Sequence, residues 1–465
     1  MDERTNGDGL QRKLGLFPLT NIVIANMVGT GIFTTSGLLM KDLHHAGIML
    51  ALWIVGGLIA LCGALSYGEL GAAMPHAGGE YAFLSRLFHP LMGFLAGWVS
   101  FFVGFSAPIA AAAIGFTEYL TRAFPSVLKI GIFGNPAAQS LLRSLHWTPE
   151  EALKRLFAIL VIVAFTYLHS RGLELGAKVQ NLLTGLQILL IVALVTAGFA
   201  VGKGSFGHLV SAGSFDFGFA GWKTMGLALM WIMFAYSGWN ASAYVGSEVR
   251  DPARNLPRSL LLGTGAVAVL YLALNLLYIY AVPAGEMEGV VSIGGLAAKN
   301  LFGRSAETIL SVLISFALFS SLSAFIILGP RVYYSMAKDG VFFKSLAKVH
   351  PKFGVPSRSI VLQGAIAAVL VMFGTLRQLL TYMGFSLGIF PILAVIGVFK
   401  LRRSGRSVIK LPGYPVASAV YVLAGVTILV LSFLQQPKVS SIAIATVLIG
   451  IPIYLVFKKK YGTPA

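Results

Sequence analysis

Long apolar runs separated by short polar connections make up most of the chain. We count about twelve runs of at least 18 mostly apolar residues between Leu16 and Phe457. Each run can cross the hydrocarbon core of a bilayer as a helix, so the pattern predicts an all-α, polytopic membrane protein. The polar segment 1–14 precedes the first run, and no small-residue cleavage site follows a short apolar region. We therefore interpret it as a cytoplasmic tail and not as a signal peptide.

The predicted spans follow one another closely along the chain. The connection after the eighth span, Arg331 to Pro356, is basic and amphipathic, and we expect it to lie along the membrane surface. The twelve spans are about Leu16–Met40, Ile48–Ala73, Met92–Leu120, Leu156–His169 with its flanks, Ala177–Val201, a span that begins near Trp222, Ser259–Val282, Ile309–Leu328, Ile360–Phe373 with its flanks, Leu379–Phe399, Val416–Leu434 and Ile442–Phe457.

Glycine and polar residues interrupt two of these runs. Gly29 to Phe33 (Gly-Thr-Gly-Ile-Phe) interrupts the first run, and Phe234 to Asn240 interrupts the sixth. Glycine weakens a helix and permits an unwound turn. In lipid, the backbone groups freed in this way must face protein or a water-filled cavity. A single glycine often serves helix packing alone, but a matched pair of breaks points to a transporter's substrate site.

The spacing of the two breaks predicts an internal repeat. A break in span one and another in span six fit two five-helix units, and an odd number of helices forces the second unit to be inverted. The predicted divisions are a first repeat at 15–201, a second repeat at 202–400, two additional helices at 401–457 and a cytoplasmic tail at 458–465.

Composition and charge support a membrane protein with both termini inside. Hydrophobic residues make up 57% of the chain and charged residues 11%, which is unlike a soluble protein. The net charge of +18 does not indicate a nucleic-acid partner, because the basic residues lie in short loops and form no patch with aromatic residues. We assign 23 of the 35 Lys and Arg residues to the inner side and 12 to the outer side. This bias predicts cytoplasmic termini in the plasma membrane.

Other chemistry is not indicated by the sequence. The Gly-Thr-Gly run follows no predicted strand and precedes no Gly-Lys-Ser/Thr, so it is no nucleotide loop. The histidines show no metal-ligand spacing. We therefore predict no enzymatic activity, no cofactor and no metal site. The only cysteine, Cys62, lies within an apolar run, so we expect no disulfide-linked ancillary subunit.

Several short motifs together resemble those of the amino acid, polyamine and organocation (APC) transporter superfamily. Gly238-Trp239-Asn240 most resembles its branch of L-type amino acid transporters, which implies exchange or facilitated uptake of neutral amino acids. The resemblance covers roughly residues 15 to 400. Its motifs are Gly29–Phe33, Phe234–Tyr236, Tyr67–Leu70 with Pro75, Gly78–Tyr81, Glu248–Arg258 and Arg331–Gly340.

The resemblance implies a LeuT-type fold in which helices 1 and 6 unwind around the substrate. The break at Gly29 would offer N–H groups at a helix N-terminus, which suits the carboxylate of an amino acid. Carbonyls at the ends of the half-helices would accept from its ammonium. The implied N–H donors are Thr30, Gly31 and Ile32, and the implied carbonyls are those of Met27, Phe234 and Ser237.

Side-chain selection in such a site would fall to residues in the second break. The candidates are Tyr236, Trp239 and Asn240. Phe234 is a candidate gate over the site, with ordinary helix packing as the alternative. No acid lies at the centre of a predicted span, which favours neutral over cationic substrates.

One departure from the family concerns coupling to ions. Many members carry a lysine in helix 5 in place of a sodium ion, and this chain has Gln187 there. Glutamine has no titratable proton, so it can neither mimic a cation nor relay protons. The amide could hydrogen-bond helix 5 to helices 1 and 8, or leave room for a cation. The nearby hydroxyls predicted on helix 8 are Ser320, Ser321 and Ser323.

The sequence thus predicts a secondary active or exchange transporter of neutral L-amino acids that works by alternating access. Its partners would be the small-molecule substrate and the lipid membrane. Two alternatives remain open: a cationic amino acid or polyamine transporter of the same superfamily, and a sensor that binds an amino acid without moving it. A channel is not favoured, because no ring of charge or filter motif is present.

Overall fold

The computed structural model describes residues 12–461 except 130–134, 145–146, 211–214 and 375. Most of the predicted tail 1–14 lies outside the described residues. The α-helices are α1 (Leu16–Met27), α2 (Thr30–Leu43), α3 (Ala46–Ala73), α4 (Glu80–Leu87), α5 (Pro90–Val99), α6 (Ala107–Ala123), α7 (Pro136–Ser144), α8 (Pro149–Ser170), α9 (Leu173–Val201), α10 (Gly207–Val210), α11 (Phe219–Ala235), α12 (Pro252–Ala281), α13 (Ala284–Met287), α14 (Ile293–Phe302), α15 (Arg304–Lys338), α16 (Ser357–Phe373), α17 (Leu376–Arg403), α18 (Val416–Gln435) and α19 (Pro437–Tyr461). The other helical segments are the π-helix η1 (Ser100–Ser106) and the 3-10 helices η2 (Pro125–Lys129), η4 (Ala241–Tyr244), η5 (Gly246–Glu248) and η6 (Lys344–Ala347).

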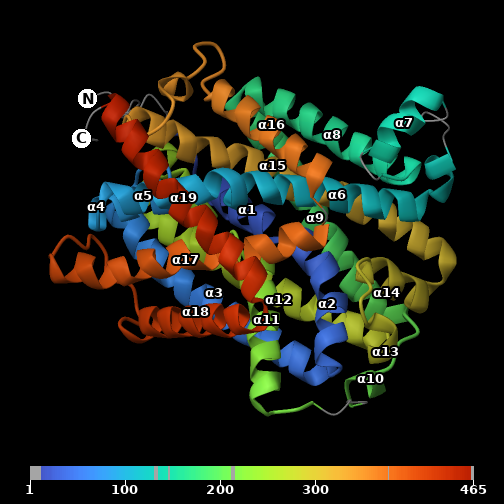
Figure 1. Ribbon diagram of the computed structural model, residues 1–465. Coiled ribbons are helices and arrows are strands. Elements are labelled where there is room, and N and C mark those ends of the chain that lie inside the picture. Colours follow the sequence, from blue (N-terminus) through green and yellow to red (C-terminus); the bar gives the residue numbers. More distant parts are fainter. Residues whose placement is uncertain (1–11, 130–134, 145–146, 211–214, 375, 462–465) are drawn as a thin grey trace.

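The described helices confirm a polytopic, all-α architecture. Ten apolar segments are long enough to cross a membrane, and α11 and α16 are shorter apolar helices. Together they account for the twelve predicted spans. Connections predicted on opposite sides of the membrane lie at opposite ends of the molecule: α4 and the α17–α18 connection at the left of Figure 1, α7, α13 and α14 at the right.

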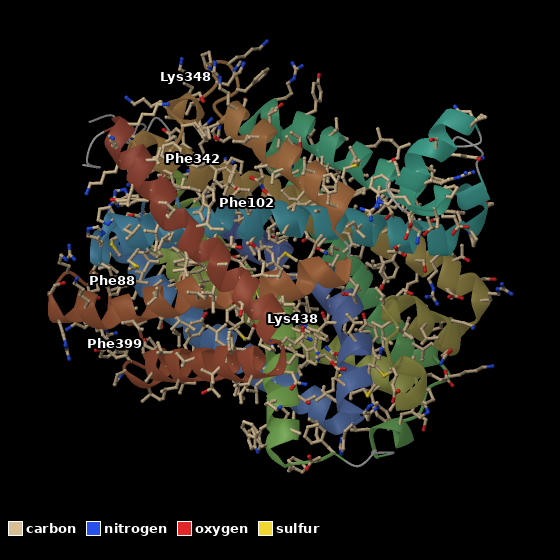
Figure 2. The ribbon with its side chains drawn as sticks, viewed as in Figure 1. Phe88, Phe102, Phe342, Lys348, Phe399 and Lys438 are labelled. Carbon is tan, nitrogen blue, oxygen red and sulfur yellow. The ribbon has the colours of Figure 1, made fainter. Side chains whose placement is uncertain are left out.

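The segment after the eighth span differs from the prediction. We expected Arg331 onward to lie along the membrane surface, but α15 continues as one helix to Lys338. Arg331 is buried, and its Nε donates to Oε1 of the equally buried Glu248 at 3.0 Å. Removing either partner would leave an uncompensated buried charge, so the pair holds this part of the chain inside the protein. Beyond α15 the chain is amphipathic, with Phe342 buried and Lys348 exposed (Figure 2).

The two predicted breaks are present, and they touch each other. The first separates α1 from α2, and the second follows α11, which packs against α2, α3 and α18 and ends in the middle of the molecule (Figure 1). A β-carbon on Gly31 would lie 2.6 Å from Cα of Ala235. A β-carbon on Gly238, whose φ is +101°, would lie 2.7 Å from Cβ of Asn26. Only glycine therefore allows the two interrupted segments to approach each other this closely.

A tyrosine from a third helix joins the two breaks. The hydroxyl of Tyr271, on α12, lies within hydrogen-bond distance of the carbonyls of Met27 and Ala235, the latter at 2.9 Å, and shares its one proton between them. These residues end α1 and α11, where the last carbonyls of a helix have no partner within it. The Tyr271 ring is fully buried and packs edge-on against Trp53, with 5.4 Å between ring centroids. One side chain thus stabilises both interruptions.

We predict that Tyr271→Phe lowers the stability of the purified protein. The change leaves buried carbonyls without a donor, which costs about 1–3 kcal/mol. Tyr278→Phe is a matched control two turns further along α12, because the buried Tyr278 hydroxyl has no hydrogen-bond partner among the described residues. Thermal unfolding in detergent should show a lower melting temperature for Tyr271→Phe only. Equal effects of the two variants would contradict the bridging role of the Tyr271 hydroxyl.

Candidate substrate site

A cavity lies beside the second break. Phe234 and the segment Ser237–Ala241 form one wall, and Asn26 from the end of α1 adjoins them. Phe105 of η1 and Phe325 of α15 contribute aromatic surface, and parts of α5, α17 and α18 complete the lining. The cavity is therefore placed where the two interrupted spans, α15 and α17 meet.

Only some of the predicted site residues line this cavity. Phe234, Ser237, Trp239 and Asn240 do. Tyr236 instead points toward α3, where its hydroxyl donates to the carbonyl of Trp53 at 3.2 Å. The predicted residues that lie at the break but outside the cavity lining are Met27, Gly29, Thr30, Gly31 and Ile32.

The backbone at the first break has the features that an anion site requires. Gly29 is the N-cap of α2 and provides no side-chain cap for the first N–H groups of that helix. These groups carry the positive end of the helix dipole. On the acceptor side, the carbonyl of Phe234 already accepts from the N–H of Ser237 at 2.9 Å, and that of Met27 accepts from Tyr271. A carbonyl oxygen has two lone pairs, so each can accept a second donor.

The Gln187 side chain connects helix 5 to the first break. Its Nε2 donates to the carbonyl of Val28 at 2.7 Å, directly before Gly29. Its Oε1 is buried and has no hydrogen-bond partner in the described part of the chain. Of the two arrangements that the sequence left open for Gln187, the structure shows the hydrogen bond to helix 1.

The three serines predicted on helix 8 have separate roles. Ser320 Oγ hydrogen-bonds Thr184 Oγ1 at 3.1 Å, so α9 and α15 are joined without Gln187. Ser321 Oγ packs against Gly29, 2.7 Å from the position of a β-carbon there. Ser323 Oγ hydrogen-bonds Nε2 of His169 at 2.8 Å. Of the three serines, therefore, only Ser321 lies against the first break, whereas Ser320 and Ser323 join α15 to α9 and α8.

Sequence reasoning missed one acidic residue of the cavity. Glu80, at the start of α4, is 3% exposed and lines the cavity. Its carboxylate accepts from the hydroxyls of Tyr67, at 2.7 Å, and Tyr244, and from Nδ2 of Asn240 at 2.5 Å. Burial raises the pKa of the Glu80 carboxyl, and these hydrogen bonds oppose that rise. Because α4 lies in a connection between spans, a search for acids within the spans could not find it.

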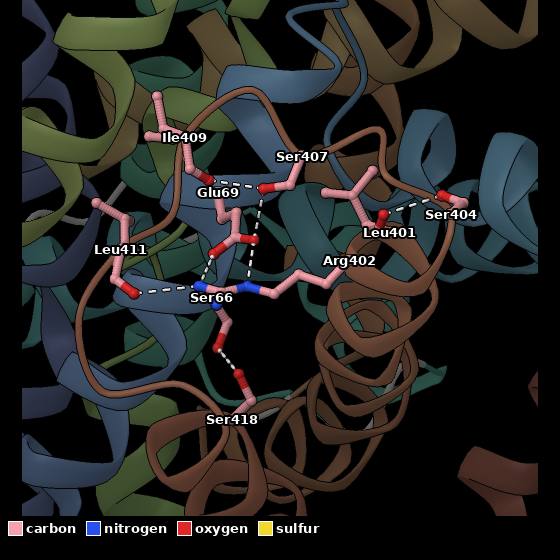
Figure 3. A network of polar contacts seen from close by, with 9 residues as sticks. All are labelled: Ser66, Glu69, Leu401, Arg402, Ser404, Ser407, Ile409, Leu411 and Ser418. Atoms are coloured by element: carbon pink, nitrogen blue, oxygen red, sulfur yellow. Dashed lines mark hydrogen bonds and ion pairs between the residues drawn. The ribbon is translucent and has the colours of Figure 1, made fainter.

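Among the described residues, the other two strongly buried carboxylates differ from Glu80 because each has a guanidinium partner. Glu248 pairs with Arg331, as described above. Glu69 of α3 accepts two hydrogen bonds from Arg402 of α17, both at 2.7 Å, and a third from Ser407 (Figure 3). The ion pairs of Glu69 and Glu248 join segments that are distant in the sequence, whereas Glu80 accepts only from neutral donors.

The turn before α4 explains how Glu80 reaches the cavity. Gly78 and Gly79 have φ values of +110° and +54°, which side chains rarely tolerate. A β-carbon on Gly79 would lie 2.5 Å from ring atoms of Tyr244. The glycine pair thus lets α4 begin directly against the Tyr244 ring. The Gly78–Tyr81 run was a visible signal in the sequence, although it did not reveal this contact.

Comparison with known proteins identifies the family of the chain. The family model described as amino acid permease matches residues 14–457. The Asc-type amino acid transporter 1 of Mus musculus is 25% identical, and the alignment covers 96% of this chain and 81% of that protein. The large neutral amino acids transporter small subunit 2 of Homo sapiens is 26% identical, with 96% and 81% covered.

A bacterial relative matches this chain over almost the full length of both proteins. The serine/threonine exchanger SteT of Bacillus subtilis is 26% identical, and the alignment covers 98% of this chain and 99% of that protein. The family match covers nearly all the described helices, including both interrupted spans. The chain therefore belongs to the amino acid permease family, within the APC superfamily.

Proposed function

We propose that this protein exchanges neutral L-amino acids across the plasma membrane by alternating access. The observation that carries the proposal is the contact between the two interrupted spans beside a cavity, with the uncapped N-terminus of α2 at the contact. The names of its relatives, among them transporters of neutral amino acids and a serine/threonine exchanger, support the same substrate class.

The amino acid would be recognised mainly through its backbone. Its carboxylate would accept from the N–H groups of Thr30, Gly31 and Ile32, where the helix dipole favours negative charge. Its ammonium would donate to a carbonyl at the second break, such as that of Ser237. Backbone recognition requires no particular side chain, which suits a protein that accepts several amino acids.

Exchange requires that the bound substrate favours the occluded state over the open ones. A ligand changes a conformational equilibrium only through its different affinity for the two states. Phe234 lines the cavity at the end of α11 and is suited to close over a bound substrate. Such contact would exist only in the loaded, closed state and would lower the barrier to reorientation.

We propose further that both termini are cytoplasmic and that the protein works without a disulfide-linked subunit. The first point rests on the distribution of basic residues. The second rests on the single cysteine, because Cys62 lies within α3, a membrane span. The proposed repeats at 15–201 and 202–400 would place the breaks in corresponding helices of the two halves.

Transport into proteoliposomes tests the proposed function directly. Vesicles loaded with unlabelled neutral L-amino acid should accumulate labelled amino acid from outside, because exchange couples its entry to exit of the internal pool. Vesicles loaded with buffer alone should accumulate far less. Saturable binding without accumulation would instead support an amino acid sensor. Accumulation of arginine or polyamines in place of neutral amino acids would support the cationic alternative.

We predict that a proton gradient alone does not drive uptake. The group at the coupling position is the Gln187 amide, which carries no charge and already donates to the carbonyl of Val28. Uptake of labelled amino acid should therefore be the same with and without an imposed pH gradient when no internal substrate is present. Gln187→Lys introduces a titratable amine at this place and should make exchange depend on pH. Proton-driven uptake by the unmodified protein would contradict the assignment.

A further inference from the structure

The cavity contains one carboxylate, and its hydrogen bonds determine how a neighbouring amide is turned. Glu80 and Asn240 both line the cavity, and no Lys or Arg belongs to its described lining. We propose that Glu80 orients the Asn240 amide so that the cavity offers acceptors to the substrate side chain, which selects amino acids with a hydroxyl or carboxamide. This inference rests on the proposed transport of neutral amino acids and specifies their class.

The donors around Glu80 make it an acceptor. Its Oε1 accepts from the Tyr67 hydroxyl and from Nδ2 of Asn240, and its Oε2 accepts from the Tyr244 hydroxyl. Burial raises the pKa of the Glu80 carboxyl, but donors of this kind oppose that rise and favour the charged form, which accepts hydrogen bonds and donates none. Since its oxygens already receive these three donors, a ligand in the cavity does not meet an unpaired carboxylate.

This arrangement fixes the orientation of the Asn240 side chain. A carboxylate can accept only from the nitrogen of an amide, so Nδ2 must face Glu80. Nδ2 also lies 3.4 Å from the Tyr244 hydroxyl. The reversed amide would place its oxygen against Oε1 of Glu80, where neither atom can donate. Asn240 therefore offers its Oδ1, an acceptor, to the cavity.

A second asparagine in the lining is turned in the same sense. Nδ2 of Asn26 donates to the carbonyl of Ile22 at 3.1 Å, one turn earlier in α1. With its nitrogen engaged in this way, Oδ1 is the atom of the Asn26 amide that is left to accept from a ligand. A substrate side chain that donates a hydrogen bond is matched by these acceptors, whereas a side-chain carboxylate would face acceptors and the charge of Glu80.

Neutral donors fit this cavity better than cations. A buried cation must lose its hydration, and it needs a bare counter-ion to recover that cost. Glu80 is a poor counter-ion for such a group, because Tyr67, Tyr244 and Asn240 donate to both of its oxygens and a cation would have to displace one of these donors to pair with it. Hydroxyl and carboxamide side chains are therefore the expected ligands.

Serine and alanine provide the sharpest test, because they differ by one hydroxyl. Competition against labelled amino acid in the exchange assay gives the inhibitory concentration of each and hence their ratio. For the unmodified protein we expect serine to compete about tenfold better than alanine, the value of one hydrogen bond to a buried acceptor. In Asn240→Leu the ratio should fall to near one, because leucine removes the amide acceptor. In Glu80→Gln the Asn240 amide can turn its Nδ2 toward the cavity, so a substrate with a side-chain carboxylate, such as glutamate, should compete better than it does with the unmodified protein.

Glu118→Gln is the matched control. Glu118 is on α6 and pairs with Lys154 at 2.9 Å outside the cavity, so the ratio should not change. If Glu80→Gln does not fold, the ratio in Asn240→Leu tests the proposal independently. A structural defect alone would weaken serine and alanine alike and leave their ratio unchanged, which would overturn the proposal.

Three further outcomes are decisive. Equal competition by serine and alanine in the unmodified protein would overturn the proposal. Stronger competition by lysine than by serine, lost in Glu80→Gln, would overturn it by making Glu80 a counter-ion. If no amino acid competes or exchanges at all, the proposed function itself fails, and that result is distinct from a ratio that does not depend on Asn240.

Discussion

The shared hydroxyl of Tyr271 is the interaction on which the architecture of the site depends. Breaking a helix within a membrane exposes carbonyls that lipid cannot satisfy. Tyr271 donates to the last carbonyls of α1 and α11, and Gln187 donates to the next carbonyl of the first break, at Val28. With these groups satisfied by α12 and α9, the breaks can pack against each other through Gly31 and Gly238. The N–H groups of α2 are thereby left for a ligand.

The same requirement governs the buried charges. Glu69 and Glu248 each have an arginine partner, and each joins elements that are distant in the sequence. Removing one partner of such a pair would leave an uncompensated buried charge. Glu80 has neutral donors instead, and it is the acid that lines the cavity. The distinction separates carboxylates that hold the helices together from one that shapes the chemistry of the site.

The sequence was sufficient for the spans and the breaks, because both follow from local composition. The length of an apolar run predicts a span, and Gly29 and Gly238 weaken a helix whatever its neighbours in the fold are. Which neighbouring helix a side chain faces depends on residues distant in the sequence. The contact of Tyr236 with Trp53 could therefore not be predicted from the sequence. The burial of Arg331 required Glu248, and the position of Glu80 required Tyr67, Tyr244 and Asn240 to converge from other segments. The roles of the predicted substrate residues stay predictions.

The central claim is that backbone groups of the two breaks recognise both ends of an α-amino acid. Isothermal titration of the purified protein with L-alanine, ethylamine and propanoate tests it most directly, because each analogue lacks one of the two charged groups. The account predicts measurable binding of L-alanine and binding at least about a hundredfold weaker for both analogues, since each loses charge-assisted hydrogen bonds. Binding of ethylamine or propanoate as tight as that of L-alanine would contradict the account.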